Sequence, residues 1–234
     1  MKITKVDVLR AKPNERGWTP VLCRIYTDEG IYGDGEAALG YGGVSRSAFG
    51  MVQDCAARIL GMNPLEHEVI WNHLYRNCFW GRNGGPMVFG GISAIDIALW
   101  DIKGKAYGVP VHELLGGKQR ESLRAYASQI QLGWGKVDHP IVKPEDYARE
   151  AKRAVSEGFT AVKVDPLWTD DKGLCTSPQR IYRTDGSDWE WKKLDTKYQL
   201  KTISDRVGAI RDAVGDNIGI VIELHGMTDV NTSI

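Results

Sequence analysis

Hydrophobic and polar residues alternate through the first part of the chain, which is the pattern of strands that bury one face. Apolar side chains recur every second or third residue in residues 3–8 and every second residue in residues 21–25. Asp28-Glu29-Gly30 provides a turn before a further strand-like run at residues 31–33. The pattern predicts a small antiparallel sheet.

From Ser45 onward the apolar residues follow helical spacing. A first predicted helix has on one face Val52, Ala56, Ile59 and Leu60, and a second covers residues 68–75. The clearest helix spans residues 91–107, since Gly108 and Pro110 stop it, and its core positions are Ile92, Ile95, Leu99, Ile102 and Ala106. A short helical turn closes at residues 114–117. Sheet and helices together predict an α+β unit over residues 1–122.

After residue 122 the pattern alternates between strands and helices, which favours a parallel sheet. Strands are predicted over residues 123–130, 160–165 and 218–224. One helix covers residues 144–157 with Tyr147, Ala151 and Ala154 inward, and a second, after a long polar insertion, has on one face Leu200, Ile203, Val207 and Ile210. Residues 123–234 therefore read as the first three strands of a (β/α)₈ barrel. Such a barrel takes about 250 residues, so we expect the chain as given to be incomplete.

Composition narrows the classes of partner. The chain has 234 residues, 42% hydrophobic and 26% charged, and its formal net charge is zero. No run of like charges suggests a nucleic-acid or membrane surface, so we expect a small-molecule partner. The N-terminus has no apolar signal region, and the four scattered cysteines form no C-x-x-C pair. These features predict a cytoplasmic protein with free thiols.

The clearest predicted helix contains the motif Gly91-Ile92-Ser93-Ala94-Ile95-Asp96-Ile97-Ala98-Leu99-Trp100-Asp101-Ile102-Lys103-Gly104-Lys105, followed by Pro110 and Leu114-Leu115-Gly116-Gly117. This motif is similar to the signature helix of the mandelate racemase/muconate lactonizing enzyme family of the enolase superfamily. Residues 27–33 with Gly35-Glu36 resemble the hairpin of the same family's capping domain. The resemblance implies an α+β capping domain over residues 1–122, closing over the mouth of a modified TIM barrel that begins at residue 123. It also implies an active site at the carboxyl ends of the barrel strands.

Two short motifs lie at those strand ends. In the strand at residues 160–165, side chains alternate, so Lys163 and Asp165 share one face while Val162 and Val164 face the helices. A buried lysine and aspartate suggest chemistry, or else a salt bridge between the two or elsewhere in the barrel. In the next strand Glu223 and His225 share a face. From the residues alone, they could be no more than a rim carboxylate and a hydrogen-bonded histidine.

The resemblance gives these residues roles. Members of the family carry the first of three metal-binding carboxylates at the end of the third strand, where this chain has Glu223, and a histidine two residues on is typical of the sugar-acid dehydratases. It implies a Mg²⁺-dependent dehydratase that removes an α-proton and eliminates water. His225 would be the general acid. Lys163 would be the base or an electrostatic partner of the substrate carboxylate, and Asp165 would orient it.

The substrate would be an aldonate or aldarate, and Arg16, Trp18 and Arg82 in the capping loops would contact it, although such residues also cover ordinary surfaces. A homo-oligomer is expected. Two alternatives stay open. The first is a racemase or epimerase of a 2-hydroxy acid, which the absence of Lys-x-Lys at residues 163–165 disfavours. The second is a truncated, non-catalytic product. The sequence does not identify the sugar acid.

Overall fold

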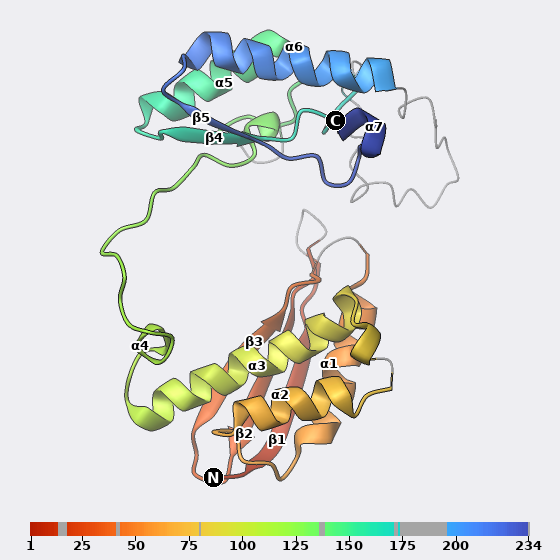
Figure 1. Cartoon of the computed structure of the whole chain (residues 1–234), viewed down its shortest axis with the longest axis vertical. Helices are drawn as coiled ribbons and strands as arrows, with labels where there is room; N and C mark the ends of the chain where they lie inside the picture. The colour runs from red at the N-terminus through yellow and green to blue at the C-terminus, as the bar shows by residue number, and fades with distance from the viewer. Residues whose placement is uncertain are drawn as a thin grey trace. The chain divides into compact units, whose positions relative to one another are not determined.

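The computed structural model describes residues 1–13, 18–40, 43–79, 81–135, 139–170, 173 and 196–233. The chain forms two compact units, Met1–Glu121 and Ser122–Ile234 (Figure 1). No helix in the described parts of the chain is long and apolar enough to cross a membrane.

The first unit is built on a three-stranded antiparallel sheet. Its strands are β1 (Ile3–Arg10), β2 (Val21–Thr27) and β3 (Tyr32–Ala37), hydrogen-bonded in that order. Of the residues in the alternating pattern, Ile3, Val21, Cys23 and Ile25 are buried in the core, and Val6 and Val8 are partly buried against it. The predicted antiparallel sheet is therefore confirmed.

Helices cover the apolar face of this sheet (Figure 1). The covering helices are α1 (Ser45–Ile59), α2 (His67–Arg76) and α3 (Pro86–Tyr107), and two short helices, η1 (Gly81–Asn83) and α4 (Val111–Leu114), precede and follow α3. Helix α3 begins at Pro86, earlier than the predicted residue 91, and proline is well suited to the first helical turn. Leu60 follows α1 and is 54% exposed, so its predicted core position is wrong.

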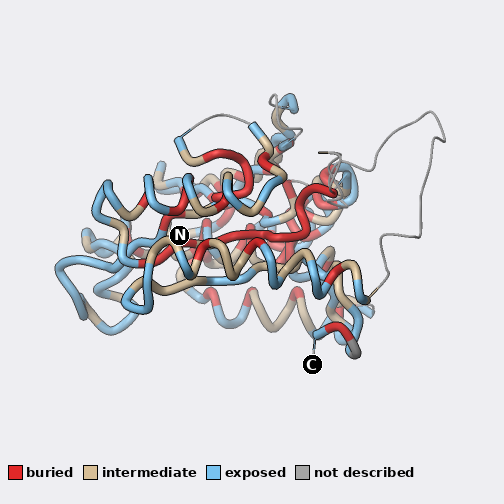
Figure 2. The backbone as a smooth tube through the Cα atoms, turned by 90° about the horizontal axis from the view of Figure 1, so that it is seen from above, coloured by how far each residue is buried: buried red, intermediate tan, exposed pale blue. Residues whose placement is uncertain are grey.

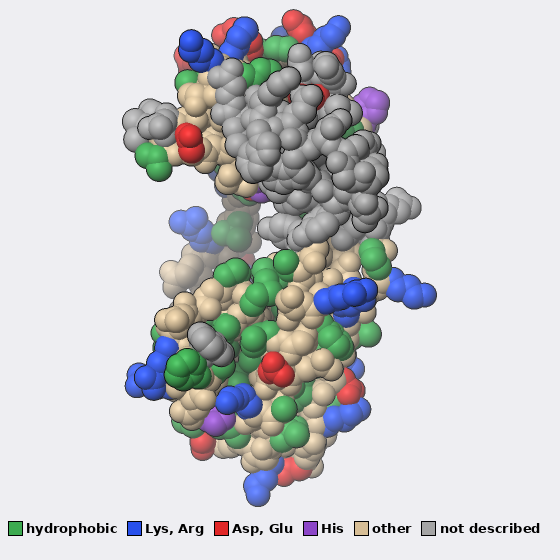
Figure 3. Space-filling model, turned by 90° about the vertical axis from the view of Figure 1, so that its right-hand side faces the viewer, with side chains coloured by type: hydrophobic (Ala, Val, Ile, Leu, Met, Phe, Trp, Pro, Cys, Tyr) green, Lys and Arg blue, Asp and Glu red, His purple; other side chains and the backbone are tan. Residues whose placement is uncertain are grey.

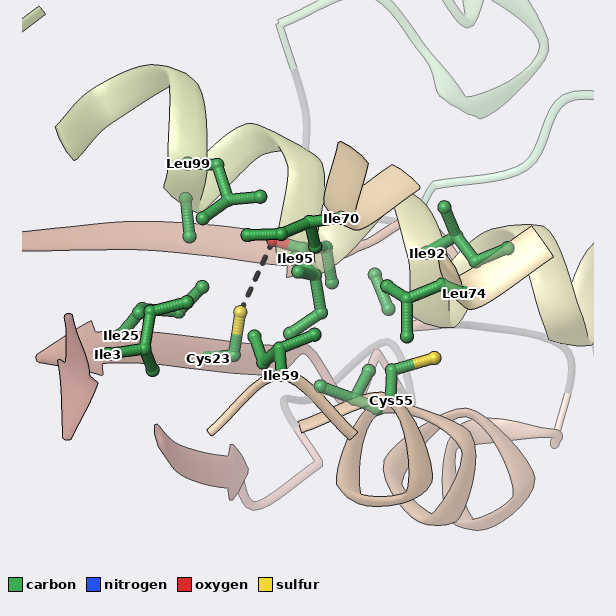
Figure 4. Close-up of a cluster of buried hydrophobic side chains, with 14 of the residues drawn as sticks. Ile3, Cys23, Ile25, Cys55, Ile59, Ile70, Leu74, Ile92, Ile95 and Leu99 are labelled. Atoms are coloured by element: carbon green, nitrogen blue, oxygen red, sulfur yellow. Dashed lines mark hydrogen bonds between the residues drawn. The ribbon is translucent and has the colours of Figure 1, made fainter. Parts of the chain in front are cut away.

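Two glycines of β3 let α3 approach the sheet closely. A Cβ atom at Gly33 would lie 2.1 Å from the carbonyl oxygen of Ala98, and one at Gly35 would lie 2.0 Å from that of Ala94. The thiol of Cys23, on the adjacent strand, donates to the same Ala94 oxygen at 3.3 Å (Figure 4). The helix backbone therefore rests directly on the strand backbone, which only glycine permits here.

The second unit contains a parallel pair, β4 (Ala161–Val164) and β5 (Gly219–Ile222). Helices α5 (Pro144–Ser156) and α6 (Thr196–Val214) lie together on one side of this pair (Figure 1). A 3₁₀ helix, η2 (Ile130–Leu132), precedes α5, and α7 (Val230–Ser233) is the last element. Val162 and Val164 pack with Tyr147, Ala151 and Ala154 of α5, as the alternation predicts. Along the helices, buried residues recur among exposed and intermediate ones (Figure 2).

Two predictions for this unit are wrong. The strand expected over residues 123–130 is reduced to one parallel bridge, Ala127 to Val162, because Gln129 adopts a left-handed backbone with φ 64° and η2 follows at once. In α6, Leu200 is 48% exposed, and the buried positions are Gln199, Arg206 and Ile210. Ile210 is buried and Val207 packs against the core as predicted, but polar side chains hold the other two buried positions.

Candidate functional site

The strand ends bring the four predicted site residues together within the second unit. Lys163 lies in β4, and Asp165 follows the end of that strand. Glu223 follows β5, and its N–H donates to the carbonyl of Val164 at 2.8 Å, which extends the strand pairing by one step. The carboxyl ends of parallel strands meet at one edge of a sheet, so the side chains of β4 and β5 converge there.

The four side chains form a continuous series of polar contacts. The Lys163 ammonium is paired with Oε2 of Glu223. The other oxygen of Glu223, Oε1, lies 2.9 Å from Nε2 of His225. Nδ1 of His225 lies 2.7 Å from Oδ2 of Asp165. Cationic or protonatable nitrogen therefore alternates with carboxylate along the series, and each of the two contacts to His225 is a hydrogen bond when the ring nitrogen carries the proton.

Asp165 is the most deeply buried of the four, with 3% of the side chain exposed. Its Oδ1 accepts from the N–H of Leu167 at 3.0 Å, and its own N–H donates to Oε1 of Gln131 at 3.2 Å. Burial raises the pKa of Asp165, and the hydrogen bond from His225 acts in the opposite direction. The carboxyl is held on several sides, as a fixed part of the site would be.

Lys163 is in a different electrostatic setting. Its hydrogen bond to Glu223 raises the pKa of the ammonium group, while partial burial acts against that rise. The ammonium also lies 5.8 Å from the ring centroid of Tyr126, within the range of a cation–π contact. Lys163 is therefore held in its charged form, which suits an electrostatic partner of an anion better than a general base.

The backbone of His225 is unusual. Its φ of 46° lies in the left-handed region, which is uncommon for residues other than glycine. The Trp168 ring lies with its centroid 6.5 Å from that of the imidazole, at an interplanar angle of 62°. Because β5 ends at Ile222, the direction of the imidazole is set by these side-chain contacts rather than by the strand pleat.

Sequence reasoning found all four residues but misassigned one contact. Asp165 pairs with His225, so the alternative of a salt bridge between Lys163 and Asp165 is wrong, whereas the role of Asp165 in orienting Lys163 stays a prediction. The salt bridge of Lys163 is with Glu223, on the neighbouring strand. Gln131, 4% exposed, was missed. A lone glutamine between apolar residues gives no signal that its amide oxygen will accept the backbone N–H of Asp165.

The predicted substrate contacts belong to the first unit. Arg16 lies outside the described residues. Trp18 is 46% exposed, and Arg82 lies in η1, where its carbonyl accepts from the hydroxyl of Tyr75 at 3.5 Å. Charged side chains of both signs are scattered over the visible face of the molecule (Figure 3). The substrate-binding role of Arg16, Trp18 and Arg82 stays a prediction.

Comparison with known proteins relates this geometry to a family. Residues 15–116 match the N-terminal domain of mandelate racemase/muconate lactonizing enzyme. A crystal structure of an enolase superfamily member from Salmonella Typhimurium is 43% identical and has a TM-score of 0.87, covering 99% of this chain and 56% of that one. The chain belongs to the mandelate racemase/muconate lactonizing enzyme family. The resemblance identified from the signature helix is thereby confirmed.

The curated relatives within this family are dehydratases by name. D-galactonate dehydratase of Pectobacterium atrosepticum is 33% identical over 229 residues, which are 98% of this chain and 50% of that protein. A D-galactonate dehydratase family member of Marinomonas is 31% identical over 96% of this chain and 53% of its own length. The chain spans about half the length of the curated relatives it matches.

The residues described here do not by themselves fit the Mg²⁺ ion that the family implies. Mg²⁺ prefers six oxygen ligands in octahedral geometry. Glu223 supplies one carboxylate, and both of its oxygens are engaged, by Lys163 and His225. Within the described ranges no group of three His, Cys, Asp or Glu side chains is arranged to hold a metal ion. The described residues therefore do not make a complete Mg²⁺ site.

Proposed function

We propose that the chain carries part of the active site of a dehydratase that acts on a sugar acid of the aldonate or aldarate type. The observation that carries the proposal is the position of His225, whose Nε2 meets Glu223 at the end of β5 while its Nδ1 is bound to the buried Asp165. The names of the family relatives support the same reaction, and they suggest D-galactonate as the first substrate to test.

The reaction would proceed by loss of the α-proton and departure of the β-hydroxyl. A base removes the proton, the electron pair of that C–H bond forms the carbon–carbon double bond, and the β carbon–oxygen bond breaks. His225 would give a proton from Nε2 to the departing oxygen, so that it leaves as water. The resulting enol rearranges to a 2-keto-3-deoxy acid. General acid catalysis matters here because hydroxide is a poor leaving group.

Lys163 would stabilise negative charge in this scheme. Its pairing with Glu223 keeps the ammonium charged, and a fixed cation near the substrate carboxylate favours the electron-rich intermediate. The base is not assigned to any described residue. Mg²⁺ dependence remains part of the proposal, with Glu223 as one ligand and the others not among the described residues.

A product screen tests this function. D-galactonate and other acid sugars are incubated with the protein and Mg²⁺, and 2-keto-3-deoxy acids are measured. Formation of a keto acid from at least one substrate supports a dehydratase. Formation of α-epimers without keto acid would instead support a racemase or epimerase, and this outcome would overturn the proposal.

A further inference from the structure

We infer that Asp165 is a positioning residue that fixes Nδ1 of His225 as the inward-facing, proton-bearing nitrogen and so leaves Nε2 as the nitrogen presented to the site. The significance for catalysis rests on the proposed function, because that function names His225 as the proton donor. The orientation of the ring is a property of this chain, and it is measurable without any turnover.

Asp165 is better anchored than the carboxylate on the other side of the ring. Its side chain is 3% exposed, whereas that of Glu223 is 31% exposed. Asp165 also accepts from the N–H of Leu167 and donates its own N–H to Gln131, a buried amide. Glu223 divides its two oxygens between His225 and the partly exposed Lys163. A ligand can therefore displace Glu223 from the ring far more readily than Asp165.

The backbone does not fix the ring in this way. His225 lies beyond the last residue of β5 and has a left-handed φ of 46°. A half-turn of χ2 would put Cδ2 in the position of Nδ1 and Cε1 in the position of Nε2 unless a side chain opposes it. Trp168 makes an aromatic contact with the ring, and Asp165 lies 2.7 Å from Nδ1. The aspartate contact favours a nitrogen over the ring carbon Cδ2 at this position.

The chemical consequence concerns the position of one proton. An ionised carboxylate has only acceptors, so the contact of Asp165 with Nδ1 is a hydrogen bond when that nitrogen carries a proton, and the contact of Glu223 with Nε2 is a hydrogen bond under the same condition. In Asp165→Asn the amide oxygen still accepts from the N–H of Leu167, and the amide nitrogen then faces the ring as a donor. We expect Nδ1 to become the acceptor and to lose its proton.

Nuclear magnetic resonance tests this on the 234-residue chain. The five histidines are labelled with ¹⁵N, and long-range ¹H–¹⁵N correlations are recorded at one fixed pH near neutrality. The His225 signals are those that disappear in His225→Asn. We expect a protonated Nδ1 in the parent and an unprotonated Nδ1 in Asp165→Asn. Glu150→Gln is the matched control, because Glu150 is a buried carboxylate of the same unit that forms ion pairs with Arg149 and Arg153.

Three results would overturn the inference: an Nδ1 without a proton in the parent, an Nδ1 that stays protonated in Asp165→Asn, or the same change in Glu150→Gln. The parent spectrum decides the matter even if Asp165→Asn fails to fold. The proposed function can fail separately. If Nδ1 is protonated in a way that depends on Asp165 but the product screen finds no keto acid, the positioning role is upheld and the dehydratase is rejected.

Discussion

The guanidinium of Arg206 in α6 lies 5.1 Å from the ring centroid of Tyr147 in α5, which places a cation inside the core of the second unit. Only 4% of Arg206 is exposed. Its N–H groups donate to the carbonyls of Val142, Pro166 and Thr169 at 2.7 to 3.1 Å. Arg206 therefore ties α6 to the segment after β4, which begins with Asp165.

Replacement of Arg206 by methionine should destabilise the second unit. The apolar chain keeps much of the packing but leaves three carbonyls without their donor, and an unsatisfied buried polar group costs about 1–3 kcal/mol. We expect the free energy of unfolding in urea to fall by at least about 2 kcal/mol. Lys201→Met is the control, because its pair with Asp205 is exposed and should matter by about 0.5 kcal/mol or less. Equal effects of the two substitutions would refute this role of Arg206.

Two Gly→Ala substitutions should have opposite effects on the first unit. In Gly35→Ala the new Cβ would lie 2.0 Å from the carbonyl oxygen of Ala94, so α3 must move off the sheet. Gly50 lies in α1, where an added methyl group would have nothing within 4 Å. We expect Gly35→Ala to lower the midpoint of thermal unfolding and Gly50→Ala to raise stability by about 0.5–1 kcal/mol. A stabilised Gly35→Ala protein would contradict the close approach.

Thiol labelling should separate the cysteines by burial. Desolvation raises the pKa of Cys23 to about 12 and that of Cys55 to about 11, from 9.0. At pH 8 their thiolate fractions should be lower than that of an ordinary thiol by about 10³ and about 10² respectively. With Cys175 replaced by alanine, an aromatic disulfide reagent should react first with Cys78, which is only partly buried. Fast labelling of Cys23 in the native protein would show that the core opens readily.

The same thiols give stability a defined pH dependence. Between about pH 9 and pH 12 an unfolded cysteine ionises while native Cys23 keeps its proton, so unfolding releases protons and stability falls as pH rises. Below pH 9 both states hold the proton and the contribution is constant. We expect Cys23→Ala to have a shallower loss of stability at alkaline pH than the parent, measured by denaturant unfolding at successive pH values. If the stability of the parent and that of Cys23→Ala fall equally as pH rises, Cys23 does not cause the pH dependence.

Substitution of His225 by asparagine should separate the two halves of the proposed reaction. Loss of proton donation should slow dehydration by about 10² to 10⁴, whereas exchange of the substrate α-proton with deuterated water should continue. Glu223→Gln should lose both, because Glu223 contacts Lys163 and His225 and is the candidate metal ligand. Both rates are measured on a substrate found in the product screen. Dehydration within a few-fold of the parent in His225→Asn would remove His225 from the acid role.

The elements that the sequence predicted well are those whose pattern is local. Strand alternation placed Val21, Cys23 and Ile25 inward, and helical spacing located α1, α2, α3 and α5. The strand predicted over residues 123–130 does not form because Gln129 adopts a left-handed backbone. No sequence pattern indicates that conformation. On α6 the burial of Ile210 was predicted, but that of Arg206 and Gln199 was missed because these side chains donate to carbonyls that lie far along the chain.

The sequence indicated which residues form the site but not which of them contact one another. Alternation within each strand put Lys163 with Asp165 and Glu223 with His225, since each pair is two residues apart. Contacts across the strands depend on register, and β4 and β5 align Lys163 with Val221 rather than with Glu223. Lys163 reaches forward to Glu223, and His225 turns back toward Asp165, sixty residues away in sequence. Such reach follows from side-chain length and a left-handed backbone residue, which periodicity does not encode.

The parallel pairing of β4 with β5 also determines the order in which the molecule can fold. Strands β2 and β3 meet across the turn at residues 28–31, so little chain must be closed before they pair. Ala161 can pair with Gly219 only after the chain between them, which includes α6, has folded back along β4. Closing a longer loop costs more entropy and slows folding. We therefore expect β2 to pair with β3 before β4 pairs with β5 during refolding, and the contact between Asp165 and His225 to form only after the second pairing.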